Sequence, residues 1–310
     1  MFTVTQGFTT PTVSYQNSCC GANSGLSQTF TYIVNDNDGT SDLTISNMLI
    51  NNVLDGRNAC YLAYDHANQI LYLVNDGGTI VAPMPFDSSG HGSGVLSNSQ
   101  CSIDGTKTYV SQYNGSTQSQ VTIGLTFTGA FGGNKVVYLA ARDKEGMNSG
   151  WYTGGVWNVP MTATYPNVVS TGYNSGYNNG SSTISVTYQD VSNNTNLSPS
   201  QILINSAIDG RNACYMGYDH KNNSLFLVAD NGTTLLPSIA PGSGTATQQN
   251  SQCIIYAQGS TVQSNGKNYT LSVQVFFMPA FRGQQVVYGA SQTIGGGNTG
   301  WQAVNAFTVR

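Results

Sequence analysis

Histidines and their neighbours are the first residues to consider for catalysis. His66 and His220 each follow an aspartate, Asp65 and Asp219, whereas His91 lies in a Gly/Ser run. A carboxylate that orients an imidazole would make a general base, but adjacent residues of a strand point to opposite faces. The chain has no Gly-x-Ser-x-Gly, phosphate-loop or His-Glu-x-x-His motif. These histidines therefore predict turns, and we expect no catalytic residue and no enzyme.

An Asp-rich segment offers different chemistry. Residues 35–42 read Asn-Asp-Asn-Asp-Gly-Thr-Ser-Asp and place Asp36, Asp38 and Asp42 around a glycine. Carboxylates at this kind of spacing, with a glycine for the turn, are typical of calcium loops. The segment lacks the bidentate Glu of the full loop, and a turn between two strands explains it as well. Calcium is thus the alternative to a purely structural turn, and we expect no other cofactor.

The chain contains two copies of one module. Residues 48–78 and 202–232 are identical at 19 of 31 positions. The match resumes further along, in Asn-Ser-Gln-Cys at 98–101 and 250–253 and in Gly-Trp at 150–151 and 300–301. A repeat of this length indicates that the chain is duplicated, and recurring residues then indicate a role in the fold.

One cation recurs in the repeat, Arg57, which corresponds to Arg211. A guanidinium can fork onto a carboxylate and satisfy it in a sheltered position. We expect two structural ion pairs, Arg57 with Asp36 and Arg211 with Asp190. The second copy keeps Asp190 but has Ser192 and Asn196 in place of Asp38 and Asp42.

Composition limits the fold and the partners. Charged residues make up 8% of the 310 residues, and hydrophobic residues make up 39%. The shortage of Glu, Lys and Arg disfavours helices, while Thr, Val and Tyr favour strands. A net charge of −4 without a basic cluster excludes nucleic acid as a partner. No apolar run approaches the length that inserts into a membrane.

Large apolar residues recur at every second position in short runs such as Phe30–Val34 and Ile184–Tyr188, as in half-buried strands. Turn residues separate these runs, which predicts an all-β protein of two tandem antiparallel sandwiches with an extended N-terminal arm. The expected parts are an arm and first-strand segment (1–26), module 1 (27–160), a linker and first-strand segment (161–182) and module 2 (183–310).

Four cysteines occupy matching positions in the two copies. Cys60 and Cys101 correspond to Cys214 and Cys253, which predicts one disulfide in each module and an oxidising, extracellular setting. Cys19 and Cys20 lie outside the repeat. They can bond to each other, bond to another chain or stay reduced, and the sequence does not choose.

The motifs Asp55–Tyr61 (Asp-Gly-Arg-Asn-Ala-Cys-Tyr), Asn98–Cys101 and Gly150-Trp151 resemble a repeat module of secreted, multidomain bacterial surface proteins. The resemblance covers nearly the whole chain, once per half. It implies the broad immunoglobulin-like or fibronectin-like sandwich class and an extracellular building block. It implies no activity, because fold does not determine function.

The N-terminal arm suggests how such a block assembles. Phe2-Thr3-Val4 precedes Pro11 by the spacing at which Trp157-Asn158-Val159 precedes Pro166, and Phe307-Thr308-Val309 is a third instance. Either the chain was cut from a longer array, or the arm supplies a strand to a neighbour. We predict an extracellular or cell-surface structural protein that forms a homopolymer by strand addition, with Phe2, Val4 and Phe8 in apolar pockets.

The alternative function is a glycan-binding or adhesive module of a larger surface protein, with a polysaccharide as its partner. Exposed tyrosines would stack on sugars in that case. Trp151 and Trp301 follow a glycine at one module position, which indicates packing instead of a sugar platform.

Overall fold

The computed structural model describes residues 8–16, 24–113, 116–162, 164–169, 181–242 and 244–310. Contacts within the chain define two compact units, which we call module 1 (residues 8–16 and Ser24–Met161) and module 2 (Thr162–Arg310). Each module begins with a short strand inside the first-strand segment predicted before it, 1–26 or 161–182. These strands are β1 (Thr12–Tyr15) and β12 (Asn167–Val169).

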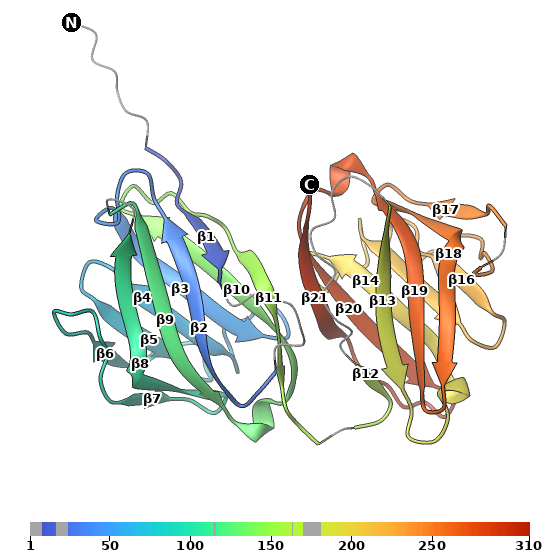
Figure 1. Ribbon diagram of the computed structural model, residues 1–310, viewed down its shortest axis with the longest axis horizontal. Helices are drawn as coiled ribbons and strands as arrows, with labels where there is room; N and C mark the ends of the chain where they lie inside the picture. The colour runs from blue at the N-terminus through green and yellow to red at the C-terminus, as the bar shows by residue number, and fades with distance from the viewer. Residues whose placement is uncertain (1–7, 17–23, 114–115, 163, 170–180, 243) are drawn as a thin grey trace, which may run out of the picture. The chain divides into compact units, whose positions relative to one another are not determined.

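Module 1 consists of two antiparallel sheets (Figure 1). The first sheet has the order β1, β2 (Ser27–Asn35), β9 (Gln118–Phe127), β8 (Cys101–Tyr113), β7 (Val95–Ser97). The second has the order β11 (Tyr152–Val159), β10 (Gly133–Asp143), β3 (Leu43–Asn51), β4 (Cys60–Asp65), β5 (Ile70–Val74), β6 (Ile80–Pro85).

Module 2 repeats this arrangement, except that its second sheet has five strands instead of six. Its first sheet has the order β12, β13 (Ser181–Gln189), β19 (Asn268–Phe277), β18 (Cys253–Asn265), β17 (Thr247–Gln249). Its second has the order β16 (Ser224–Leu227), β15 (Cys214–Asp219), β14 (Leu197–Asn205), β20 (Gly283–Thr293), β21 (Gln302–Val309).

The strand order defines the type of sandwich. In module 1, β1-β2-β9-β8 corresponds to strands A-B-E-D of an immunoglobulin domain, and β11-β10-β3-β4-β5 corresponds to G-F-C-C′-C″. Module 2 has the same correspondence through β12-β13-β19-β18 and β21-β20-β14-β15-β16. The protein is therefore all-β, with two tandem immunoglobulin-like sandwiches of the variable type.

Alternation of apolar residues builds the core between the sheets. Phe30, Tyr32 and Val34 of β2 are fully buried, and the Phe30 ring meets Trp157 of β11 at a centroid distance of 5.0 Å. Burying a side chain of this size contributes about 1.5–3 kcal/mol. In module 2 the equivalent residues of β13, Ile184, Val186 and Tyr188, are buried in the same way. The residues between them are only half-buried, because alternate side chains of a strand point to opposite faces of its sheet.

Helices contribute almost nothing to the described part of the chain. Its three helices, η1 (Gly129–Phe131), η2 (Asn194–Asn196) and η3 (Pro279–Phe281), are single 3₁₀ turns. None of them has the length or the apolar character needed to span a bilayer.

Candidate functional site

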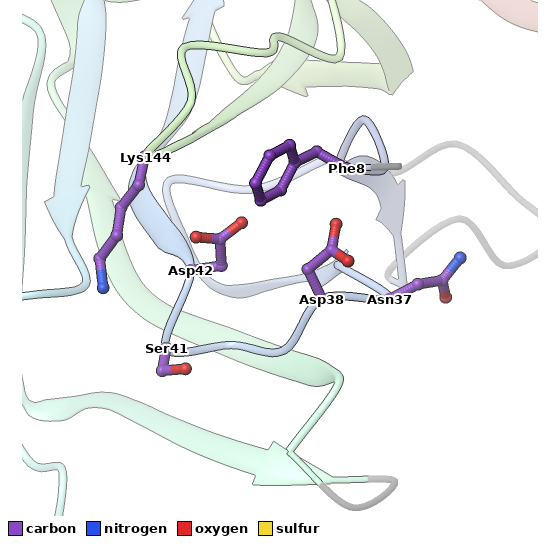
Figure 2. A pocket seen from close by; sticks show the side chains of 6 residues that line it. All are labelled: Phe8, Asn37, Asp38, Ser41, Asp42 and Lys144. Carbon is purple, nitrogen blue, oxygen red and sulfur yellow. The ribbon is translucent and has the colours of Figure 1, made fainter. Parts of the chain in front are cut away.

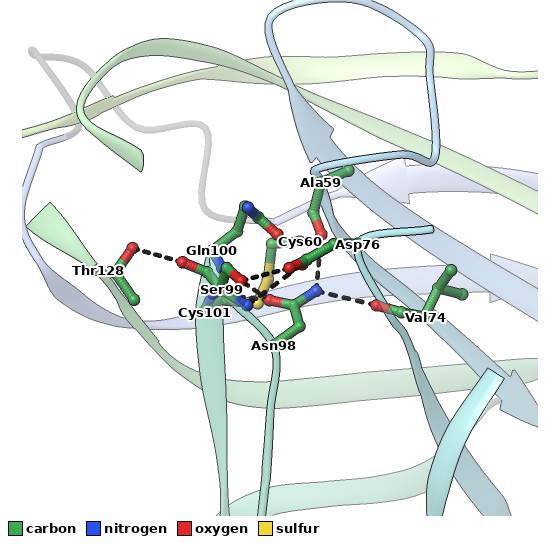
Figure 3. The surroundings of a disulfide bond; sticks show 9 residues. All are labelled: Ala59, Cys60, Val74, Asp76, Asn98, Ser99, Gln100, Cys101 and Thr128. Atoms are coloured by element: carbon green, nitrogen blue, oxygen red, sulfur yellow. Dashed lines mark hydrogen bonds between the residues drawn. A yellow bond between two sulfur atoms is a disulfide. The ribbon is translucent and has the colours of Figure 1, made fainter. Parts of the chain in front are cut away.

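Both predicted disulfides are present, and each joins the two sheets of its module. Cys60 of β4 bonds to Cys101 of β8 (Figure 3), and Cys214 of β15 bonds to Cys253 of β18. In strand letters this bridge runs from C′ to D, whereas antibody domains link B to F. Bonds of this kind persist in oxidising compartments. Because each bridge runs from one sheet to the other, it holds the sandwich of its module closed.

An asparagine next to each bridge explains the Asn-Ser-Gln-Cys motif. The Asn98 amide donates to the carbonyls of Ala59 and Val74, both at 2.9 Å, and its oxygen accepts from the backbone of Gln100 and Cys101 (Figure 3). Asn250 makes the same four bonds in module 2. A fully satisfied, sheltered amide is a structural device, because every donor and acceptor is already used.

The predicted ion pairs with Asp36 and Asp190 are wrong. Arg57 donates to Asp55 at 2.6 Å and Arg211 to Asp209 at 2.7 Å, each within its own loop. Each aspartate lies two residues before its arginine and also accepts a hydrogen bond from that arginine's backbone N–H, so the ion pair forms within the loop. Both guanidinium groups are more than 70% exposed, and these arginines shelter no carboxylate.

The Asp-His dipeptides do not form catalytic dyads. Asp65 accepts from the backbone and the side chain of Asn68, while His66 Nε2 lies 2.9 Å from Ser46 Oγ. Burial lowers the pKa of His66 to about 4, against a smaller opposing effect of Asp65. Asp219 similarly accepts from Asn222 and the backbone of Lys221, so these acids close turns.

A cluster of five carboxylates is the most unusual feature of module 1. Asp36, Asp38 and Asp42 lie on the loop between β2 and β3, and Asp143 and Glu145 lie where β10 ends. One carboxylate oxygen from each of Asp36, Asp38 and Asp42 lies within 4.8 Å of the other two, and the same holds for Asp42, Asp143 and Glu145. We call these five residues the acidic cluster, and Asp42 belongs to both of its triads.

Three oxygens of the acidic cluster are buried without a hydrogen-bond partner in the described chain: Oδ2 of Asp36, Oδ2 of Asp42 and Oδ2 of Asp143. Asp36 and Asp143 are each only 1% exposed. Their Oδ1 atoms are used, since Asp36 accepts from the Asp38 backbone at 2.9 Å and Asp143 from the Met147 backbone at 2.7 Å. A buried, unpaired carboxylate oxygen is costly, so these atoms need a proton or a cation.

The electrostatics of the acidic cluster agree with its geometry. Burial, followed by the charges of Asp42, Asp38 and Asp143, raises the pKa of Asp36. Burial, then Asp42 and Asp143, raises the pKa of Glu145. The ion pairs of the described residues include none of the five carboxylates. Negative charge is thus concentrated here without a direct ion pair among the described residues.

The base of the N-terminal arm lies against the acidic cluster. Thr9 donates to Asp38 Oδ2 from its backbone at 2.6 Å and from its hydroxyl at 2.9 Å. Figure 2 shows the ring of Phe8 above the carboxylates of Asp38 and Asp42, with Lys144 on the other side of Asp42. These residues line an open cavity of about 330 Å³. Solvent and small ions therefore have access to the cluster through Asp38 and Asp42.

Each module also presents a Trp–Tyr pair. Trp151 is 39% exposed and contacts the Tyr61 ring at 6.1 Å, so it is more open than the sequence analysis expected. Trp301 contacts Tyr215 at 5.7 Å, and the Tyr215 hydroxyl donates to Gln201. Gln201 and Trp301 line a cavity of about 130 Å³. Aromatic rings beside amides are suited to stacking against sugars.

Sequence reasoning missed Asp143 and Glu145. They lie far from residues 36–42 in the chain, and only the pairing of β3 with β10, which matches Leu43 with Asp143, brings them together. The sequence could have indicated them through the difference between the two copies, because module 2 has Thr293 and Gly295 at the positions of Asp143 and Glu145. Of the other expected site residues, Phe2, Val4, Cys19 and Cys20 lie outside the described residues, as does 170–180 of the predicted linker.

Comparison with known proteins gives little about function. No protein-family model and no curated protein matches the chain. A solved structure described as a marsupial T cell receptor shares 10% identity with it, at a TM-score of 0.28 over 96% of this chain and 73% of that chain. Because this score is low, the fold assignment depends on the chain's own strand order.

Proposed function

We propose that the protein is a non-enzymatic, extracellular structural protein, a subunit of a surface fibre or other assembly that grows by strand addition through the N-terminal arm. The two disulfide-closed sandwiches support a role as rigid building blocks outside the cell. The resemblance to repeat modules of secreted bacterial surface proteins agrees with this role.

The observation that carries the proposal is a repeated spacing. Trp157 and Val159 of β11 point into the core of module 1 and precede the start of β12 at Asn167. Phe2 and Val4 precede the start of β1 at Thr12 by the same interval. The arm thus carries the alternating side chains that a last strand buries, and strand addition would bury them in a neighbouring sheet.

Deletion of residues 1–7 tests this role. The deletion must stop there, because Val13 and Tyr15 of β1 belong to the core of module 1. We expect the full chain to form oligomers or polymers by light scattering and negative-stain imaging, and the deleted chain to be monomeric with unchanged circular dichroism. Double substitution Phe2→Asp and Val4→Asp should have the same effect, with Thr3→Asp and Thr5→Asp as the matched control. Assembly that survives the deletion would refute the proposal.

The repeated Trp–Tyr pairs favour a second candidate, a glycan-binding module. It predicts a monomer that is retained on a polysaccharide column through stacking on the rings. The double variant Trp151→Ala and Trp301→Ala should then elute without retention, while Leu235→Ala, which truncates an exposed apolar side chain elsewhere, should behave as wild type. Wild-type protein that no polysaccharide retains would exclude this candidate.

A further inference from the structure

We propose that module 1 binds Ca²⁺ at the acidic cluster, between the β2–β3 loop and the turn after β10, and that module 2 has lost or never gained this site. The inference concerns a loop site of module 1 and does not depend on strand addition by the arm. The two modules have the same fold, so each serves as a reference for the other.

The first argument compares Asp36 with its equivalent, Asp190. In module 2 the Asn196 amide donates to Asp190 Oδ2 at 3.2 Å, and Ser192 donates to Asp190 Oδ1 at 3.0 Å. Module 1 has Asp42 at the position of Asn196. A carboxylate cannot donate, so the Oδ2 atoms of Asp36 and Asp42 remain buried and unpaired. In module 1 the carboxylate of Asp42, an acceptor, thus stands where module 2 has the donating amide of Asn196. A cation at this point would satisfy the Oδ2 atoms of both Asp36 and Asp42.

The second argument compares Asp143 with its equivalent, Thr293. Thr293 Oγ1 accepts from the Gly297 backbone at 2.8 Å, as Asp143 Oδ1 accepts from the Met147 backbone at 2.7 Å. One oxygen is therefore enough to close this turn. The second oxygen of Asp143 is not needed for the turn, and it is buried without a partner inside the cluster.

The donor set selects the type of cation. The cluster offers only carboxylate oxygens, which suit hard cations and not the softer metals that prefer nitrogen or sulfur ligands. Calcium binds oxygens at about 2.3–2.6 Å, so two ligands of one ion lie at most about 5 Å apart. Both triads of the cluster meet this limit at 4.8 Å. Calcium also accepts irregular geometry and water ligands, which the open cavity beside Asp42 admits.

The position of the cluster indicates what the ion would do. Asp36 directly follows β2 of one sheet, whereas Asp42 directly precedes β3 of the other sheet and Asp143 is the last residue of its strand β10. An ion shared by these residues would tie the two sheets together at the end where the arm enters. Thr9 adds the arm's base through its two bonds to Asp38.

Calorimetric titration of the chelator-treated full chain with CaCl₂ at neutral pH tests the proposal. We expect one or two ions per chain, because Asp42 is shared by two triads. Calcium should raise one of the two module unfolding transitions by roughly 10 °C when its free concentration is about a hundredfold above Kd. The other transition should not move.

The substitution Asp42→Asn reproduces module 2 and should fold, because the introduced amide can donate to Asp36 as Asn196 donates to Asp190. It should weaken calcium binding at least about tenfold and remove the shift of the module 1 transition. The triple variant Asp38→Ser, Asp42→Asn and Asp143→Thr should abolish binding. The matched control is Asp190→Asn in module 2, which should titrate like wild type.

Three results would overturn the proposal: no binding at millimolar calcium, binding that Asp42→Asn leaves intact, or an equal loss in Asp190→Asn. In one of these cases the wild-type chain would not bind calcium, while Asp42→Asn would raise the stability of module 1. This result would show that Asp36 and Asp42 share a proton instead of a cation. The deletion of residues 1–7 leaves all five carboxylates in place. Loss of assembly and loss of calcium binding are therefore separate outcomes.

Discussion

The Asn98 amide uses its whole hydrogen-bonding capacity to connect three segments of module 1. It reaches the carbonyls of Ala59 and Val74 and closes the turn that leads into Cys101. Such a group stabilises only as long as all of its partners remain, because each partner left unpaired in a sheltered place costs free energy.

The variants Asn98→Ala and Asn250→Ala should therefore each lower the free energy of unfolding of their module by about 2–4 kcal/mol, since several buried groups lose their partner. Urea denaturation measures the loss. Ser251→Ala is the control from the same motif, because this exposed hydroxyl accepts from the neighbouring Gln252 side chain, and it should change little. Equal effects of Asn250→Ala and Ser251→Ala would contradict the assignment.

His66 predicts a pH dependence of stability. Its pKa is lowered from the usual 6.5 to about 4, mainly by burial beside Tyr64 and Ser46, while Asp65 acts in the opposite direction. Between pH 6.5 and 4 the unfolded chain binds a proton that the native chain does not, so acidification lowers the free energy of unfolding. The pH profile of His66→Gln, measured with excess chelator, should fall less across this window than that of wild type. Parallel profiles would exclude His66 as the cause.

At the scale of elements, each disulfide fixes β4 to β8, or β15 to β18, across the sandwich. The closed loops span 41 and 39 residues. We expect Cys60→Ala with Cys101→Ala, and separately Cys214→Ala with Cys253→Ala, to lower the free energy of unfolding by about 4 kcal/mol each, as loop-closure entropy predicts. Chemical denaturation provides the measurement, and each double variant is the control for the other. Strongly unequal losses would show that strain or packing, not loop entropy, dominates.

The sequence was sufficient for the strands, the duplication and the disulfides, because these follow from alternation, self-similarity and recurrence. It was not sufficient for contacts set by loop conformation. Arg57 forms its ion pair with Asp55 of the same loop and not with Asp36. Residue recurrence does not predict this contact, because it depends on how the loop folds locally. Recurrence indicates residues that both copies need for the fold. It does not indicate Asp143 and Glu145, which are present in module 1 and replaced in module 2.

At the scale of the whole molecule, the ion pairs of the described residues contribute little to stability. The ion pairs among the described residues are Arg57–Asp55, Lys107–Asp104 and Arg211–Asp209, and all three are exposed. Exposed ion pairs contribute little to the free energy of unfolding even at low salt, and added salt screens them further. Raising NaCl from about 0.1 to about 1 M should therefore not lower the melting temperature. The double variant Arg57→Ala and Arg211→Ala should melt like wild type in differential scanning calorimetry, and a clear drop would contradict this assignment.

The C′–D placement of the disulfide has a mechanical consequence. Tension applied to the chain ends acts on β1 to β3 and on β8 to β11, which lie outside the loop closed by Cys60 and Cys101. These strands can be peeled apart, but the enclosed loop cannot extend while its bridge is intact. At about 3.4 Å per residue, a stretched module would stop roughly 140 Å short of its full contour length, and would keep that length in reserve until a reductant opened the bond.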